Sequence, residues 1–134
     1  MNWVNHYLTE AVYLDGGRGP VEYDCWGLVR EVRAQHLGLS ELPSYGDLRN
    51  DKPRLFTKAY REQSSKMREC EPEHGAIAAV LIGDICTHVA VVLDFDGELF
   101  VLEINPEKSA RRVRLCEWLR GHSKVTFHTD RTDD

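Results

Sequence analysis

AIAAVLIGDICTHVAVVLDFDGELFVLEI, residues 76–104, contains three apolar runs, each of the length of a buried β-strand. The runs are residues 76–82, 86–93 and 99–104. Asp96-Gly97 lies between the last two runs and predicts the tight turn of a β-hairpin. Further along, residues 112–115 alternate like a half-exposed strand, and residues 124–128 have the composition of a last one.

The residues before this stretch have the periodicity of helices. Amphipathic helices are expected over residues 3–14, over residues 25–37, and from Pro53 to near Cys70. Asp24 stands where an N-cap belongs, which places Cys25 in the first turn of the second helix. Because helices come first and strands afterwards, the sequence predicts an α+β fold with an antiparallel sheet rather than an alternating doubly wound fold.

The chain has 134 residues and no internal repeat or linker-like segment, so we expect a single domain over residues 1–134 with a polar tail from about residue 129. The formal net charge of −5 gives no broad electrostatic reason to bind nucleic acid or an anionic membrane. No apolar run approaches the length of a membrane span. We therefore expect neither a nucleic-acid partner nor membrane insertion.

The four cysteines, at positions 25, 70, 86 and 116, form no Cys-x-x-Cys pair and are expected to be reduced thiols. An alternative is a zinc site built from Cys70, His74, Cys86 and His88, which supply zinc-ligand side chains. Their spacing matches no compact zinc finger, so we expect no metal and no cofactor.

A cysteine at a helix N-terminus lies where the backbone dipole and free N–H groups stabilise a thiolate, so Cys25 is a candidate nucleophile. Such a cysteine needs a base, and His88 at the start of an apolar strand is the best candidate. A third group would hold the imidazole in one tautomer, and Glu103 or Asn105 could reach it from the neighbouring strand. The alternatives are a buried cysteine, a core histidine and an exposed strand glutamate.

The run YDCWGLV, residues 23–29, resembles the nucleophile motif of NlpC/P60 cysteine peptidases, in the phage-tail variant that has Trp after the Cys. Tyr13, twelve residues before the nucleophile and followed by Gly16-Gly17, is similar to the family's Tyr-x-Trp-Gly-Gly segment. The run HVAVVL from His88 is similar to the strand that carries the family's base.

This resemblance covers roughly residues 7–115 and implies a papain-like fold, with N-terminal helices packed on an antiparallel β-sheet. Two residues depart from the family pattern. Asp15 replaces the usual Trp, which alters the wall of the cleft near Tyr13, and Glu103 replaces the usual His unless Asn105 is the third residue. A carboxylate or an amide oxygen can accept a hydrogen bond from an imidazole N–H, as in other Cys–His enzymes.

The function that the resemblance implies is that of a hydrolase, a cysteine endopeptidase acting on amide bonds in the stem peptides of peptidoglycan. In that mechanism Cys25 is the nucleophile, His88 the base and acid, and Glu103 the orienting residue. The backbone N–H of Cys25, helped by the Tyr13 hydroxyl, would stabilise the oxyanion.

The setting suggested by the Trp-containing motif is the tail tip of a phage or prophage virion, where the protein would aid cell-wall degradation during DNA delivery. The first residues lack the pattern of a secretory signal, so synthesis in the host cytoplasm is expected, with other tail-tip proteins as partners. The alternative is a structural tail-tip or assembly subunit with the same fold and little hydrolysis. A thiol acyltransferase ranks last, because in its permuted relatives the His precedes the Cys.

Overall fold

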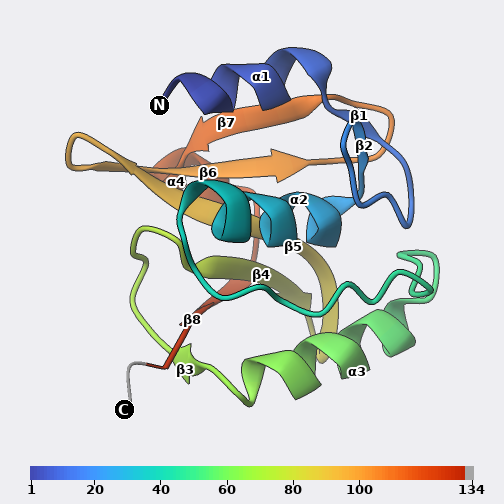
Figure 1. Ribbon diagram of the computed structural model, residues 1–134. Helices are drawn as coiled ribbons and strands as arrows, with labels where there is room; N and C mark the ends of the chain where they lie inside the picture. The colour runs from blue at the N-terminus through green and yellow to red at the C-terminus, as the bar shows by residue number, and fades with distance from the viewer. Residues whose placement is uncertain (132–134) are drawn as a thin grey trace.

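The computed structural model describes residues 1–131 (Figure 1). Its helices are α1 (Asn2–Glu10), α2 (Cys25–Glu31) with a π-helical continuation over Val32–His36, α3 (Pro53–Ser64) and α4 (Leu115–Arg120). Its strands are β1 (Val12–Tyr13), β2 (Glu22–Tyr23), β3 (Arg68–Glu69), β4 (Ile77–Ile82), β5 (Ile85–Phe95), β6 (Glu98–Ile104), β7 (Ala110–Arg114) and β8 (Lys124–Thr129). No helix within residues 1–131 is long and apolar enough to cross a membrane.

The main sheet has six strands in the order β3-β8-β4-β5-β6-β7, and every neighbouring pair is antiparallel. The predicted hairpin between β5 and β6 is confirmed: Phe95 pairs with Glu98, and the turn residues Asp96 and Gly97 both have positive φ, 52° and 92°. Two residues with positive φ give the turn whose twist matches that of the flanking strands. The chain therefore combines helices with an antiparallel sheet, as the α+β prediction requires.

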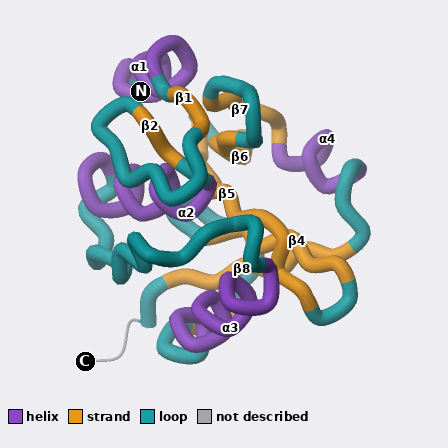
Figure 2. The backbone as a smooth tube through the Cα atoms, turned by 90° about the vertical axis from the view of Figure 1, so that its right-hand side faces the viewer, coloured by secondary structure: helices purple, strands orange, loops and turns teal. Residues whose placement is uncertain are grey.

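Two helical layers cover the sheet. Figure 2 shows α1, α2 and the small parallel pair β1–β2 on one side of the sheet and α4 on the other. Because side chains alternate along a strand, β4, β5 and β6 each contribute to two cores. The larger core joins Val29 of α2 to Val91 and Leu102 of the sheet. The smaller core packs Val101 against Trp118 of α4.

Three element boundaries differ from the sequence-based expectations, each because tertiary pairing overrides local periodicity. The first helix ends at Glu10 rather than residue 14, because Val12 and Tyr13 pair with β2. The helix that begins at Pro53 ends at Ser64, short of Cys70, and the next residues join the sheet edge as β3. Leu115 begins α4 instead of ending a strand, and this helix buries Trp118 on the sheet.

The predicted polar tail is partly wrong. Thr129 belongs to β8, where it pairs with Arg68. Asp130 forms an ion pair of 2.7 Å with the fully buried Arg33 and accepts a hydrogen bond of 2.9 Å from the Ser40 hydroxyl. A buried guanidinium needs an anionic partner, and this requirement draws the start of the tail onto the core. Residues 132–134 of the predicted tail lie outside the described residues.

Candidate active site

Cys25 is the first residue of α2, and its side chain is almost completely covered, with 2% exposure. The predicted N-cap is confirmed: Oδ1 of Asp24 accepts a hydrogen bond of 2.8 Å from the backbone N–H of Gly27. The same carboxylate accepts a hydrogen bond from the backbone N–H of Gly16 and pairs with Arg18 at 2.7 Å. Asp24 thus ties the segment before the helix to its first turn, and this fixes the position of Cys25.

A backbone-to-backbone contact brings that preceding segment against the helix. A Cβ atom added to Gly27 would lie 2.2 Å from the carbonyl oxygen of Gly17, which no side chain can tolerate. The Gly17 carbonyl also accepts a hydrogen bond of 3.2 Å from the backbone N–H of Asp24. The glycine after the Cys-Trp pair is therefore a packing requirement of the site, because only glycine allows the two backbones to approach so closely.

His88 and Glu103 meet where β5 and β6 separate. The two strands are paired from the hairpin turn to Val91 and Leu102, and the pairing stops there. Just beyond that point, Nε2 of His88 lies 2.8 Å from Oε1 of Glu103. Glu103 is 2% exposed, so the interpretation as an ordinary exposed strand residue is wrong. Because the two strands no longer pair here, the N-terminus of α2 in the helical layer can approach His88 of the sheet.

Three donors surround the Glu103 carboxylate. Oε1 accepts hydrogen bonds from His88 and, at 2.9 Å, from Nε1 of Trp118, and Oε2 accepts one of 2.6 Å from Nε of Arg111. Burial by itself raises the pKa of Glu103, but His88, Trp118 and Arg111 outweigh it and lower that pKa to about 2. Glu103 is consequently a carboxylate at neutral pH, and it can accept a hydrogen bond from Nε2–H of His88.

Two opposing effects act on the pKa of the His88 imidazole. Burial lowers its pKa, whereas hydrogen bonds and charges from Cys25 and Glu103 raise it, and the result is a pKa raised to about 9. Because Nε2 is committed to Glu103, Nδ1 is the ring nitrogen left for the Cys25 thiol. The arrangement is a thiol, an imidazole and a carboxylate in sequence, which is the order that activates a cysteine for nucleophilic attack.

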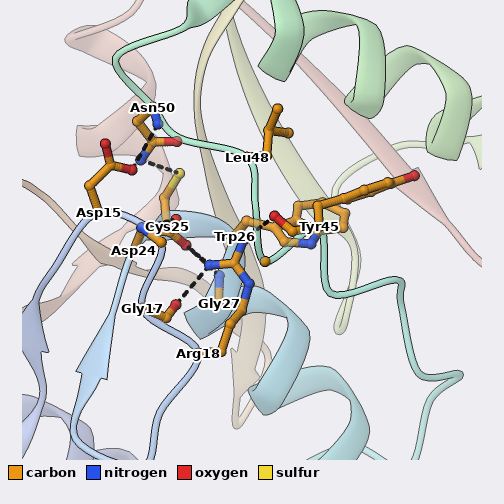
Figure 3. A network of polar contacts seen from close by, with 12 residues as sticks. Asp15, Gly17, Arg18, Asp24, Cys25, Trp26, Gly27, Tyr45, Leu48 and Asn50 are labelled. Carbon is orange, nitrogen blue, oxygen red and sulfur yellow. Dashed lines mark hydrogen bonds and ion pairs between the residues drawn. The ribbon is translucent and has the colours of Figure 1, made fainter.

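A fourth side chain, Asn50, lies over the thiol (Figure 3). Its Nδ2 is 3.8 Å from Sγ of Cys25 and donates a hydrogen bond of 2.7 Å to the hydroxyl of Tyr13. Its backbone N–H donates to Oδ1 of Asp15 at 2.8 Å. Burial raises the pKa of Tyr13 to about 12, with the Asn50 hydrogen bond opposing that shift, so the phenol is protonated at neutral pH.

The loop that carries Asn50 is fastened to the helix beside the site. Nε1 of Trp26 donates to the carbonyl of Pro43 at 2.9 Å, and the Arg18 guanidinium donates to the carbonyls of Ser44 and Tyr45 at 2.7 and 3.1 Å. These bonds hold the start of the loop beside the N-terminus of α2, and Asn50 further along the loop contacts Cys25. Sequence reasoning missed Asn50, because an asparagine in a loop is ordinarily a turn residue; the one available signal was the unusual Asp15.

The structure brings together all four predicted site residues, namely Cys25, His88, Glu103 and Tyr13. Asn105 is not part of the group: within residues 1–131, no hydrogen bond joins its side chain to His88. The zinc alternative finds no geometric support, because His88 faces Glu103 and His74 accepts a hydrogen bond from the backbone N–H of Asp94. Over that same described range, no three His, Cys, Asp or Glu side chains gather in a way that could hold a metal ion.

Comparison with protein-family models gives no match for this chain, and a search of curated proteins gives no significant match either.

Proposed function

We propose that this chain is a cysteine peptidase with a papain-like fold of the NlpC/P60 type, which hydrolyses amide bonds in peptidoglycan stem peptides. The observation that carries the proposal is the group formed by Cys25, His88 and Glu103, with His88 Nε2 held at 2.8 Å by a buried carboxylate. A carboxylate whose pKa is lowered to about 2 stabilises an imidazolium beside it, which is the role of the third residue in such a group.

The proposed reaction has two stages. In the first, Nδ1 of His88 holds the proton of the Cys25 thiol, and Sγ forms a bond to the carbonyl carbon of the amide while an electron pair moves onto the oxygen. The tetrahedral intermediate then collapses with cleavage of the C–N bond, and the leaving amine takes the proton from His88. In the second stage, His88 removes a proton from water, which attacks the thioester and releases a carboxylic acid and the Cys25 thiol.

The substrate class and the setting come from the resemblance of the YDCWGLV run to the phage-tail variant of the family. On this basis the protein would act at the tail tip of a phage or prophage virion, next to other tail-tip proteins. Tail attachment would hold the enzyme at the cell wall and raise its effective concentration there, so weak binding of substrate by the chain alone would be sufficient.

The test is digestion of purified peptidoglycan and of defined muropeptides, with the products identified by mass spectrometry. Wild-type protein and Cys116→Ala, which removes an exposed thiol far along the chain, should release new stem-peptide fragments. Cys25→Ala should release none. Equal fragment release by Cys25→Ala would contradict the proposal, and the masses of the fragments would identify the bond cleaved.

A second candidate function, a structural tail-tip subunit with little hydrolysis, is favoured by the 2% exposure of Cys25 and by the closed loop above it. Its expected signature is loss of tail assembly on deletion of the protein, with assembly and infectivity retained in Cys25→Ala. Loss of infectivity in Cys25→Ala particles that are otherwise fully assembled would favour the peptidase instead.

A further inference from the structure

The side chain of Asn50 has one polar group directed at the reaction centre. Nδ2 carries two protons, and the two acceptors near it are the Tyr13 hydroxyl at 2.7 Å and Cys25 Sγ at 3.8 Å. The first distance is that of an ordinary hydrogen bond, whereas the second is a long contact to sulfur. One N–H is therefore donated to Tyr13, and the other is donated over a longer distance to Sγ of Cys25, the reacting atom.

The position of Nδ2 next to Sγ is compatible with a hydrogen bond to an oxyanion formed at the sulfur. When Sγ becomes bonded to a carbonyl carbon, the carbonyl oxygen lies close to the sulfur, beside the line from Sγ to Nδ2. A separation of 3.8 Å between Sγ and Nδ2 allows this oxygen to lie at about 2.9 Å from Nδ2, the distance at which an oxyanion-hole donor is effective.

The amide is also held before any substrate arrives. The Asp15 carboxylate accepts the backbone N–H of Asn50 at 2.8 Å, and the Tyr13 hydroxyl accepts from the side chain. Figure 3 shows Asp15 and Asn50 side by side above Cys25, with dashed lines for the contacts of Asn50 to Asp15 and to Cys25. A donor that is fixed in advance costs no reorganisation when charge develops on the substrate oxygen.

We infer that Nδ2 of Asn50 is the side-chain donor of the oxyanion hole, next to the backbone N–H of Cys25, and that Tyr13 and Asp15 position it. The inference rests on the proposed acyl-transfer function and adds to it a residue from the loop over residues 38–52. It also changes the role of Tyr13, whose hydroxyl oxygen accepts a hydrogen bond from Asn50 and so holds the amide in place. Asp15 positions Asn50 by accepting a hydrogen bond from its backbone N–H.

The experiment separates reactions that develop an oxyanion from one that does not. Acylation of Cys25 by p-nitrophenyl acetate passes through a tetrahedral oxyanion, whereas alkylation by iodoacetamide is a displacement at saturated carbon without one. Both probes are independent of wall chemistry. Rates are measured for wild type, Asn50→Ala, Asn50→Asp and Tyr13→Phe, with Asn105→Ala as a matched control outside the site.

Asn50→Ala should lower the acylation rate about 100-fold, the usual effect of removing one oxyanion-hole donor, with alkylation unchanged or faster. Asn50→Asp should lower acylation at least as much, and its carboxylate beside the thiol should also slow alkylation. Tyr13→Phe should lower acylation less than Asn50→Ala, and Asn105→Ala should match wild type. An unchanged acylation rate in Asn50→Ala would overturn the inference. An equal fall in both rates would also overturn it, because that pattern indicates a displaced loop or a less reactive thiol.

The same measurements distinguish this inference from the proposed function. If wild type is acylated in an Asn50-dependent manner but cuts no stem peptide, the donor role of Asn50 stands and the proposed substrate is wrong. If Cys25 is not acylated at all in wild type, there is no oxyanion for Asn50 to stabilise, and the inference fails with the peptidase. If wild type cuts stem peptides and Asn50→Ala cuts them equally fast, only the inference fails.

Discussion

Nε2 of His88 and Oε1 of Glu103 lie 2.8 Å apart, although the residues are 15 positions apart on strands that have stopped pairing at that point. The carboxylate is almost fully buried and has two further donors, Trp118 and Arg111. A buried carboxylate is stable only when charge and hydrogen bonds compensate its lost hydration. His88 supplies part of that compensation, so the two residues control each other's protonation.

Replacing Glu103 with Gln should change the pH dependence of catalysis. In the proposed reaction, release of the amine requires protonated His88, so the activity should fall above about pH 9, the pKa of His88. Gln keeps the shape but removes the charge that helps to raise this pKa. The alkaline limb should therefore move to lower pH and kcat should fall, by about tenfold or more.

The measurement is the pH–rate profile of muropeptide cleavage for wild type and Glu103→Gln. Glu117→Gln, on the exposed side of α4, is the matched control and should keep the wild-type profile. An alkaline limb that stays in place in Glu103→Gln would show that the carboxylate does not govern the protonation of His88.

The free energy of unfolding should depend on pH through the same pair. The pKa of Glu103 is lowered from 4.5 to about 2, so its contribution is complete above about pH 4.5 and is lost as the pH falls toward 2. The pKa of His88 is raised from 6.5 to about 9, so its contribution is complete below about pH 6.5 and is lost as the pH rises toward 9. Stability from this pair is greatest between these limits.

Urea unfolding at a series of pH values measures this dependence. Glu103→Gln should be less stable at pH 5.5 by about 3 kcal/mol, because it leaves the largely buried imidazolium of His88 without its anionic partner. The free energy of unfolding of this variant should also fall less steeply between pH 4.5 and 2. Parallel curves for the two proteins over that acid range would contradict the assignment of the low pKa to Glu103.

Removing Asp24, the N-cap of α2, should lower the stability of the fold around the site. Asp24→Ala loses the hydrogen bonds to Gly27 and Gly16 and the ion pair with Arg18, so we expect a loss of about 2 kcal/mol in the free energy of unfolding. Asp24→Asn keeps an acceptor oxygen for the cap and should lose clearly less. Equal losses in the two variants, measured by thermal or urea unfolding, would mean that the cap bond contributes little.

The close approach of α2 to the preceding segment gives a further prediction. Gly27→Ala places a Cβ 2.2 Å from the carbonyl oxygen of Gly17, and the backbone must move to accommodate it. A loss of about 1–3 kcal/mol in the free energy of unfolding is expected, together with a fall in the alkylation rate of Cys25 if the helix terminus shifts. Gly121→Ala, where the nearest contact of a Cβ is an ordinary 3.6 Å, is the control and should be nearly neutral.

Local patterns were sufficient for the elements that position the site. The apolar runs of residues 76–104 correspond to β4, β5 and β6, and the Asp-Gly turn between the last two forms as expected, because its residues adopt the positive φ that such a hairpin requires. Asp24 caps α2 because a carboxylate at that place satisfies a free backbone N–H. These features depend on residues that are close together in the sequence, so they can be predicted from a single sequence.

The composition of the candidate site depended on tertiary structure. The choice of Glu103 over Asn105 follows from Trp118 and Arg111, which belong to α4 and β7 and stabilise a carboxylate at only one of the two positions. Asn50 joins the site through Asp15, 35 positions away, and through Tyr13. The sequence by itself determined the three strands of residues 76–104, the capped start of α2 and the pair Cys25 and His88. The third and fourth members of the site were decided by contacts between distant segments, which no local pattern encodes.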